Sequence, residues 1–230
     1  MLFRNLIFVS LAPVLIIAFY IYHSDRYEKE PLSVLLKALF TGALTIIPAV
    51  IIEGLIAEPS GAGEGLASAG YTAFVVAGFT EELMKYLAFY FFFWQERNFN
   101  EKFDGIIYAV YISLGFAAVE NILYVFSGGM GVGFVRAFTA VPAHALFGIS
   151  MGYYFGLARF DSRYRILKLM LAFIVPFFFH GLYDFLLMSK SQVLLTVFVP
   201  VFIYYWATGF RKISKLSDAS PFRDSPGRRS

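Results

Sequence analysis

Cysteine is absent from this 230-residue chain, and charged residues make up only 15% of it. The absence of cysteine excludes disulfides, thiolate metal sites and a cysteine nucleophile. Soluble domains contain about 25% charged residues, so the low charge excludes an ordinary soluble protein. What the chain has instead is hydrophobic residues, at 59%, and aromatic residues, at 20%. This composition predicts an integral membrane protein in contact with the lipid bilayer, and it gives no indication of nucleic-acid binding.

Apolar segments long enough to cross a bilayer recur along the chain and predict an all-α bundle of seven or eight transmembrane helices. The first segment lacks a strongly basic start and a cleavage pattern, so we expect a retained span. A membrane domain is expected over residues 1–210, followed by a basic, disordered cytoplasmic tail over 211–230. Seven spans can be drawn: Leu6–Tyr22, Leu32–Ile56, Tyr71–Trp94, Gly105–Phe126, Ala137–Ala158, Leu167–Met188 and Val193–Phe210.

The basic residues predict how these spans are oriented. Fifteen of the 19 Lys and Arg residues follow the first, third, fifth and seventh spans. The remaining four are Arg4, Arg136, Lys190 and, within the third span, Lys85. Because loops rich in Lys and Arg stay in the cytoplasm, the N-terminus is expected outside and the C-terminus inside. The stretch 58–70, which is rich in small residues and has no Lys or Arg, is expected to be an external loop.

Ionisable residues inside the predicted spans are the main functional signal. Glu81, Glu82 and Lys85 lie within one apolar segment, although a charge at the bilayer centre costs at least about 2.5 kcal/mol. A buried ion pair that only packs helices would account for Lys85 and one glutamate, but it leaves the second glutamate without a structural use. Further polar residues within the spans are Glu120, Asn121, His144, His180 and Asp184.

Depth and spacing suggest that these residues meet. Counting about 1.5 Å per residue from the external helix ends places Glu81, Glu120, His144 and His180 roughly 10 to 16 Å deep, in one layer of the outer half of the bilayer. His180 and Asp184 are four positions apart, so the carboxylate can orient the imidazole. His144 also begins a row with Gly148, Gly152 and Gly156, which is typical of a close-packed helix face.

This set of residues suits hydrolysis by an activated water molecule. We expect Glu81 to be the base, with Glu82 either paired with Lys85 or sharing that role. His180, oriented by Asp184, would act at the oxyanion or the leaving group. The supporting residues would be Glu120, His144, Lys85 and Asn121, the last of which could equally serve helix packing.

Zinc chemistry is the rival mechanism. Glu82, His144 and His180 could bind the metal, with water as the fourth ligand. The helical zinc signature His-Glu-x-x-His is absent, however. We therefore expect no cofactor, and rank zinc second.

Four motifs together resemble the PrsW family of bacterial intramembrane proteases. They are Glu81-Glu82-Leu-Met-Lys85, Phe116-Ala-Ala-Val-Glu120-Asn121, His144-Ala-Leu-Phe-Gly148 and His180-Gly-Leu-Tyr-Asp184. The resemblance extends from about Leu11 to Arg211. Related CAAX prenyl endopeptidases and bacteriocin-processing proteins share the paired glutamates and the histidine motifs, but have His where this chain has Glu120.

The resemblance implies a multi-pass protease of the bacterial plasma membrane. Its substrate would be a single-pass anti-sigma factor similar to RsiW, cut at site 1 near the external face. That cut would start the activation of an extracytoplasmic-function sigma factor in envelope stress.

Two other classes of protein stay open from the residues alone. One is a proton-coupled transporter, which would accumulate a solute under a pH gradient. The other is a non-catalytic substrate-binding subunit, which would tolerate loss of Glu81.

Overall fold

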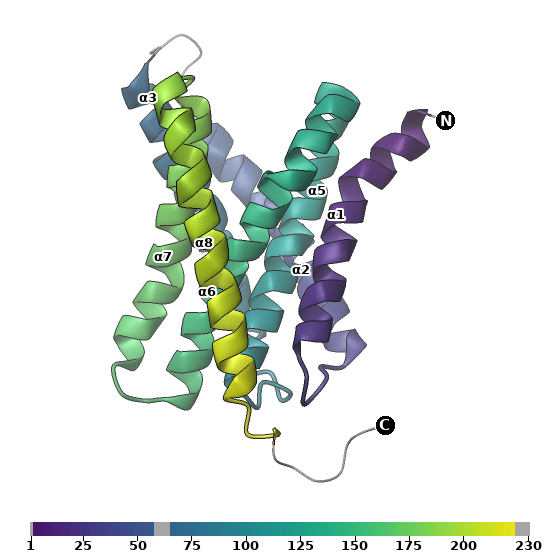
Figure 1. The fold of residues 1–230 in the computed structure, drawn as a ribbon, viewed down its shortest axis with the longest axis vertical. Helices are drawn as coiled ribbons and strands as arrows, with labels where there is room; N and C mark the ends of the chain where they lie inside the picture. Colours follow the sequence, from purple (N-terminus) through teal and green to yellow (C-terminus); the bar gives the residue numbers. More distant parts are fainter. Residues whose placement is uncertain (1, 58–64, 224–230) are drawn as a thin grey trace.

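The computed structural model describes residues 2–57 and 65–223, and within them every regular element is a helix. Helices α5, α6, α7 and α8 form most of the visible face of the bundle, with α1 and α2 to one side (Figure 1). The elements are α1 (Leu2–Ser24), α2 (Leu32–Ile56), α3 (Leu66–Gly70), the π-helix η1 (Tyr71–Phe79), α4 (Thr80–Phe92), α5 (Lys102–Phe138), α6 (Ala140–Phe160), α7 (Arg165–Met188) and α8 (Gln192–Asp218).

Five helical stretches of the described chain are long and apolar enough to cross a membrane. Large apolar side chains such as Leu55, Phe8 and Phe91 point outward and are mostly exposed, as expected for contact with lipid. The five stretches are Phe3–Ser24, Leu32–Ile56, Lys102–Phe160, Arg165–Met188 and Gln192–Asp218. The chain thus has the character of a multi-pass membrane protein.

The stretch Lys102–Phe160 is not one straight helix, because α5 reverses direction at Gly129. The backbone of Gly129 has φ 79°, in the left-handed region that favours glycine. The Nε of Arg136 donates a hydrogen bond to Oδ1 of Asn121 at 2.9 Å, although fifteen positions separate the two residues. In a continuous helix they would be about 22 Å apart. The end of α5 therefore folds back beside its own middle.

Helix α5 forms the centre of the bundle, and glycines let its neighbours approach closely. A Cβ added at Gly152 of α6 would lie 2.1 Å from the carbonyl oxygen of Gly105, and one at Gly156 would lie 2.1 Å from that of Lys102. A Cβ added at Gly115 would similarly lie 1.9 Å from the carbonyl oxygen of Leu39 in α2. The predicted close-packed face on α6 is confirmed, and α5 is the helix packed against it.

Two local expectations differ from the structure. Within the expected external loop 58–70, residues Leu66–Gly70 form α3, while 58–64 lie outside the described residues. Within the expected tail 211–230, residues 211–218 form the last turns of α8. Leu216 and Ser217 are buried against the bundle, and Ser217 donates a hydrogen bond to the carbonyl of Ser24, which keeps these turns in place. The remainder of that tail from 224 onward lies outside the described residues.

The segment that carries the two glutamates is irregular. The stretch Leu66–Phe92 passes through α3, η1 and α4. The wide turns of η1 end at Phe79, two residues before Glu81, and π-helical turns often occur at functional sites. A Cβ added at Gly78 would lie 3.0 Å from the backbone nitrogen of Gly181, so η1 packs tightly on α7. This contact brings the start of α4 beside the middle of α7.

Candidate active site

Lys85 joins the two glutamates on α4. Its Nζ donates hydrogen bonds to Oε2 of Glu81 at 3.1 Å and to Oε1 of Glu82 at 2.8 Å. The Lys85 and Glu82 side chains are fully buried, whereas the Glu81 side chain is 8% exposed. The spacing in the sequence left open which carboxylate the lysine would contact, and the structure shows that it contacts both.

The third contact of Lys85 is with His144 of α6. The Lys85 Nζ lies 3.1 Å from Nδ1 of His144, and Nε2 of the same ring lies 2.8 Å from Oε2 of Glu120 in α5. An ammonium group can only donate hydrogen bonds, so Nδ1 accepts and Nε2–H donates to the carboxylate. The two partners therefore select one tautomer of His144.

His180 of α7 lies among three carboxylates. Its Nδ1 is 2.9 Å from Oε1 of Glu82, and its Nε2 is 3.3 Å from Oδ2 of Asp184 and 3.9 Å from Oε2 of Glu81. The ring also stacks on Phe147 at a centroid distance of 4.7 Å. Asp184 contacts the imidazole as its four-residue spacing predicts, but the shorter contact is with Glu82, on a different helix.

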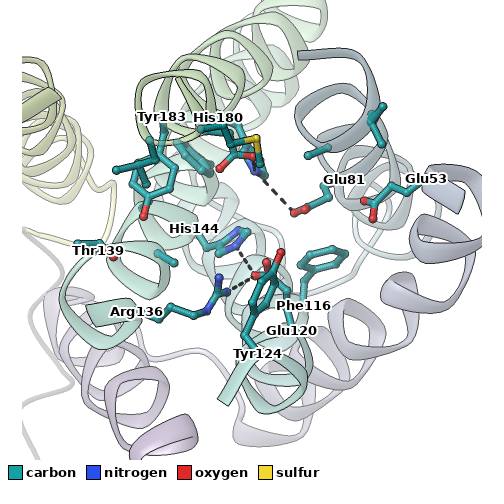
Figure 2. A pocket seen from close by; sticks show the side chains of 18 of the residues that line it. Glu53, Glu81, Phe116, Glu120, Tyr124, Arg136, Thr139, His144, His180 and Tyr183 are labelled. Atoms are coloured by element: carbon teal, nitrogen blue, oxygen red, sulfur yellow. Dashed lines mark hydrogen bonds and ion pairs between the residues drawn. The ribbon is translucent and has the colours of Figure 1, made fainter. Parts of the chain in front are cut away.

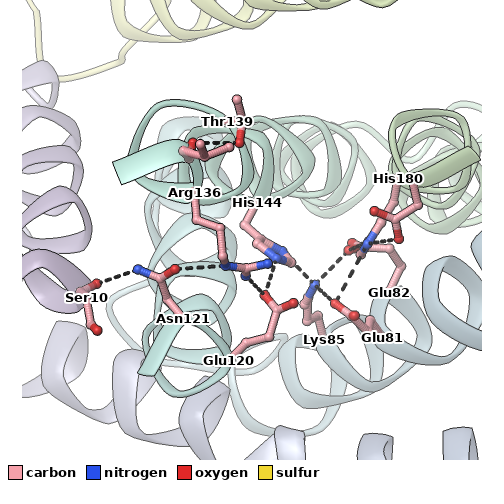
Figure 3. Close-up of polar contacts among 12 residues, drawn as sticks. Ser10, Glu81, Glu82, Lys85, Glu120, Asn121, Arg136, Thr139, His144 and His180 are labelled. Carbon is pink, nitrogen blue, oxygen red and sulfur yellow. Dashed lines mark hydrogen bonds and ion pairs between the residues drawn. The ribbon is translucent and has the colours of Figure 1, made fainter. Parts of the chain in front are cut away.

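A chain of polar contacts continues from this cluster to α1 (Figure 3). The Arg136 guanidinium pairs with Oε2 of Glu120 at 2.7 Å and also bonds Asn121. Asn121 in turn donates to the carbonyl of Ser10 at 2.8 Å. The sequence indicated Asn121 as a supporting residue. In the structure it links α1 to the Arg136–Glu120 pair and does not line the cavity described next.

A cavity of about 490 Å³ opens beside the cluster (Figure 2). Glu81, Glu120, His144, His180 and Asp184 all line it, whereas Glu82 and Lys85 lie behind its wall. From these side chains it extends toward one end of the bundle, because its lining also includes residues near the ends of helices: Thr72, Val135, Arg136, Thr139, Leu187 and Met188. A substrate segment that entered from that end would meet Glu81 first among the paired glutamates.

Sequence reasoning missed two charged residues of this cavity. Glu53 projects into it from α2, and Arg136 from the end of α5. Glu53 is an acid within the apolar run Ile-Ile-Glu-Gly-Leu-Ile, so the rule that singled out Glu81 could have found it. Arg136 was assigned to the external side, and only the reversal at Gly129 brings it to Glu120.

The same residues can be tested against a metal ion. Glu81, Glu82, His144 and His180 each offer one ligand atom, and these atoms lie within 4.8 Å of one another. Two imidazoles and two carboxylates are a donor set that zinc accepts. The Lys85 ammonium, however, already hydrogen-bonds three of the four side chains. As they are arranged, these side chains fit a lysine cation and do not fit a metal ion beside it.

Buried acids and imidazoles grouped at a cavity inside a bundle of apolar helices define a class: a membrane-embedded hydrolase. Residues 30–208 match the family described as PrsW family intramembrane metalloprotease. The chain belongs to the PrsW family of intramembrane proteases.

Curated relatives support this membership over most of the chain. The chain is 40% identical to Protease PrsW of Geobacillus kaustophilus over 189 residues, which cover 82% of each protein. It is 35% identical to Protease PrsW of Bacillus subtilis over 211 residues, covering 91% of this chain and 94% of the relative. Protease PrsW of Clostridioides difficile is also 35% identical, over 94% of this chain and 93% of its own. No solved structure matches the chain.

Proposed function

We propose that this protease makes the first cut in a single-pass anti-sigma factor, close to the external face of the membrane. The cut would start the proteolysis that activates an extracytoplasmic-function sigma factor in envelope stress. The observation that carries the proposal is the position of Glu81, the one member of the glutamate pair that lines the cavity. It provides a carboxylate where a substrate and a water molecule can both reach it.

The proposed topology has seven crossings, with the N-terminus outside. Helix α1 begins and α8 ends at opposite ends of the bundle, as an odd number of crossings requires (Figure 1). The reversal at Gly129 divides Lys102–Phe160 into two crossings, and α3, η1 and α4 together supply another. Loops rich in Lys and Arg then lie in the cytoplasm. The cavity opens toward the other end, where an external juxtamembrane segment would enter.

Glu81 is the proposed general base. It takes a proton from a water molecule as the water oxygen bonds to the carbonyl carbon of the substrate. Glu82 is fully buried and bonds both Lys85 and His180, so its proposed role is to position these two side chains. The division of labour within the glutamate pair thus follows from which carboxylate faces the cavity.

His180 is proposed to stabilise the oxyanion that forms on the carbonyl oxygen. With a proton on both ring nitrogens, its Nδ1–H donates to Glu82, and its Nε2–H, near Glu81 and Asp184, faces the cavity and can donate to the oxyanion. The C–N bond then breaks as Glu81 returns the proton to the leaving nitrogen, which gives a carboxylic acid and an amine. Glu120 and His144 hold the Lys85 ammonium in place from the other side of the cluster.

Lys85 supplies the positive charge that the glutamates need, so we propose that the reaction requires no metal ion. Purified protein in lipid nanodiscs should cleave an anti-sigma factor, and a strong zinc chelator should leave the rate unchanged. A loss of activity that added zinc restores would instead assign the chemistry to a bound metal.

The catalytic roles are tested by substitution. Glu81→Gln and His180→Ala should each lower kcat at least about 100-fold, because each removes a group that acts in the transition state. Glu96→Gln is the matched control, since Glu96 lies after α4 and pairs with Lys37 away from the cavity. Variants of Glu81 and His180 that are folded and cleave as fast as the parent would overturn the assignment.

A further inference from the structure

Glu53 is a cavity carboxylate that the proposed mechanism does not use. It lies on α2, three residues before the helix ends at Ile56, and lines the cavity together with Glu81. Figure 2 shows its side chain directed into the pocket from the wall that α2 forms. The carboxylate therefore borders the space that a substrate would occupy.

One oxygen of Glu53 has no partner within the described part of the chain. Its Oε1 is buried from solvent and accepts no hydrogen bond from residues 2–57 or 65–223. Leaving a buried charged acceptor without a donor costs more than about 1–3 kcal/mol. Because the Glu53 side chain as a whole is only partly buried and lines the cavity, a ligand there can bring a donor to this carboxylate.

The charges around the cavity indicate which donor. The two fixed cations of the site are already engaged, Lys85 by Glu81 and Glu82, and Arg136 by Glu120. Even with a proton on both nitrogens of His180, the carboxylates outnumber the cations. The carboxylates in and behind the cavity wall are Glu53, Glu81, Glu82, Glu120 and Asp184. This excess of negative charge favours a positively charged ligand group.

The position of Glu53 matches such a group on a membrane-spanning substrate. It lies near the end of α2 at the open end of the cavity, on the same side as Thr72 and Met188. Lys and Arg side chains near the end of a substrate helix reach toward the membrane boundary. A basic residue that flanks the substrate's span could reach the carboxylate while the backbone lies at Glu81.

We propose that Glu53 is a specificity-determining residue that binds a lysine or arginine side chain of the substrate beside the bond to be cleaved. The inference rests on the proposed function, because it treats the cavity as the site for a protein substrate. The charge pair fixes which peptide bond lies against Glu81. Glu53 thus acts on substrate choice and binding, and not on proton transfer.

The test uses synthetic peptides with one membrane span. At a single position in the segment that flanks the span, each peptide has Lys, Gln or Glu, and this position is moved along the segment from one set of peptides to the next. The full-length parent in nanodiscs should cleave the Lys peptide at least about tenfold more efficiently than the Glu peptide, through a lower KM. Glu53→Gln should reduce this preference, and Glu53→Lys should reverse it. Asp218→Asn, at the exposed end of α8, is the control that should keep the parent's ranking.

Binding separates this inference from the proteolytic function. The same peptides, labelled with a fluorophore, are titrated into Glu81→Gln protein with and without Glu53→Lys. A preference for Lys that Glu53→Lys reverses supports the inference even if no variant cleaves. Equal binding of the three peptides, or an unchanged ranking in Glu53→Lys, overturns it. Because each comparison is made within one protein, partial misfolding of a variant leaves the ranking interpretable.

Discussion

Lys85 is fully buried, and each of its three ammonium protons has an acceptor. The acceptors, Glu81, Glu82 and His144, come from two different helices. The ring of Phe116 lies 4.2 Å below the same nitrogen, which adds a cation–π contact. A buried ammonium is stable only when its donors are satisfied, so this lysine both organises the site and depends on it.

Removing this cation should destabilise the protein strongly. Lys85→Met retains most of the side-chain volume but leaves two carboxylates buried without their partner. We expect a loss of about 3–5 kcal/mol, measured as a lower Tm in detergent. Lys215→Met, at an exposed position near the end of α8 where Lys215 contacts Tyr153, should change the stability by less than about 0.5 kcal/mol. Equal stability of the two variants would show that Lys85 does not hold the glutamates.

The gathering of Glu81, Glu82, His144 and His180 could be predicted at the residue scale, because these costly ionisable groups lie at a similar depth in three different spans. The contacts that these side chains make with one another could not be predicted. The Lys85–His144 contact joins residues 59 positions apart, and Glu82 replaces Asp184 as the shortest contact of His180. Such pairings depend on helix rotation and crossing, which periodicity does not determine.

At the scale of elements, the α5–α6 contact controls where His144 lies. Gly105, Gly152 and Gly156 bring the two backbones together, and Glu120 and His144 then face each other at 2.8 Å. The apolar runs predicted the helices well, since they depend only on length and hydropathy. They also predicted that the chain turns back between Phe126 and Ala137, but not that it does so at Gly129, because a glycine in a membrane helix is common and only its backbone angle shows a turn.

A methyl group at this contact should separate the helices. Gly152→Ala places a Cβ 2.1 Å from the carbonyl oxygen of Gly105, so we expect a loss of at least about 2 kcal/mol and weaker proteolysis. Gly131→Ala is the matched control, because nothing lies within 4 Å of its added Cβ and its Tm should be unchanged or slightly higher. Thermal unfolding of both variants in detergent tests this, and similar losses in the two would contradict it.

At the scale of the whole molecule, a second acidic group lies at the end of the bundle opposite the cavity. Asp25 and Glu30, in the connection between α1 and α2, are buried beside α5. Burial raises the pKa of Asp25 to about 7, with a further contribution from the negative charge of Glu101. Burial also raises the pKa of Glu30 to about 7, although a hydrogen bond from the Tyr108 hydroxyl at 2.5 Å opposes the shift.

These two acids make stability depend on pH. In the unfolded protein both carboxyls lose their protons near pH 4, whereas in the folded protein they retain them up to about pH 7. The folded protein binds more protons between these values, so stability should fall as pH rises from 4 to 7. The Tm in detergent should decrease by several degrees between pH 5 and pH 8.

The double variant Asp25→Asn, Glu30→Gln provides the control for this effect. It has no carboxyl groups at these positions, so its Tm should depend less on pH over the same range. A parent protein whose Tm rises from pH 5 to pH 8 would contradict the assignment. The sequence could not predict this group, because the partner of Glu30 is Tyr108, 78 positions away.

The glycine contacts between α5 and α6 have a consequence for how relatives of this protein diverge. Glu81, Glu82 and His180 carry the proposed chemistry, but a descendant could keep all three and still lose the site. Larger side chains at positions 105, 152 and 156 would hold α6 away from α5, and His144 could no longer reach Glu120. In evolutionary terms, we expect selection to act on these glycines as strictly as on the acids and the imidazole.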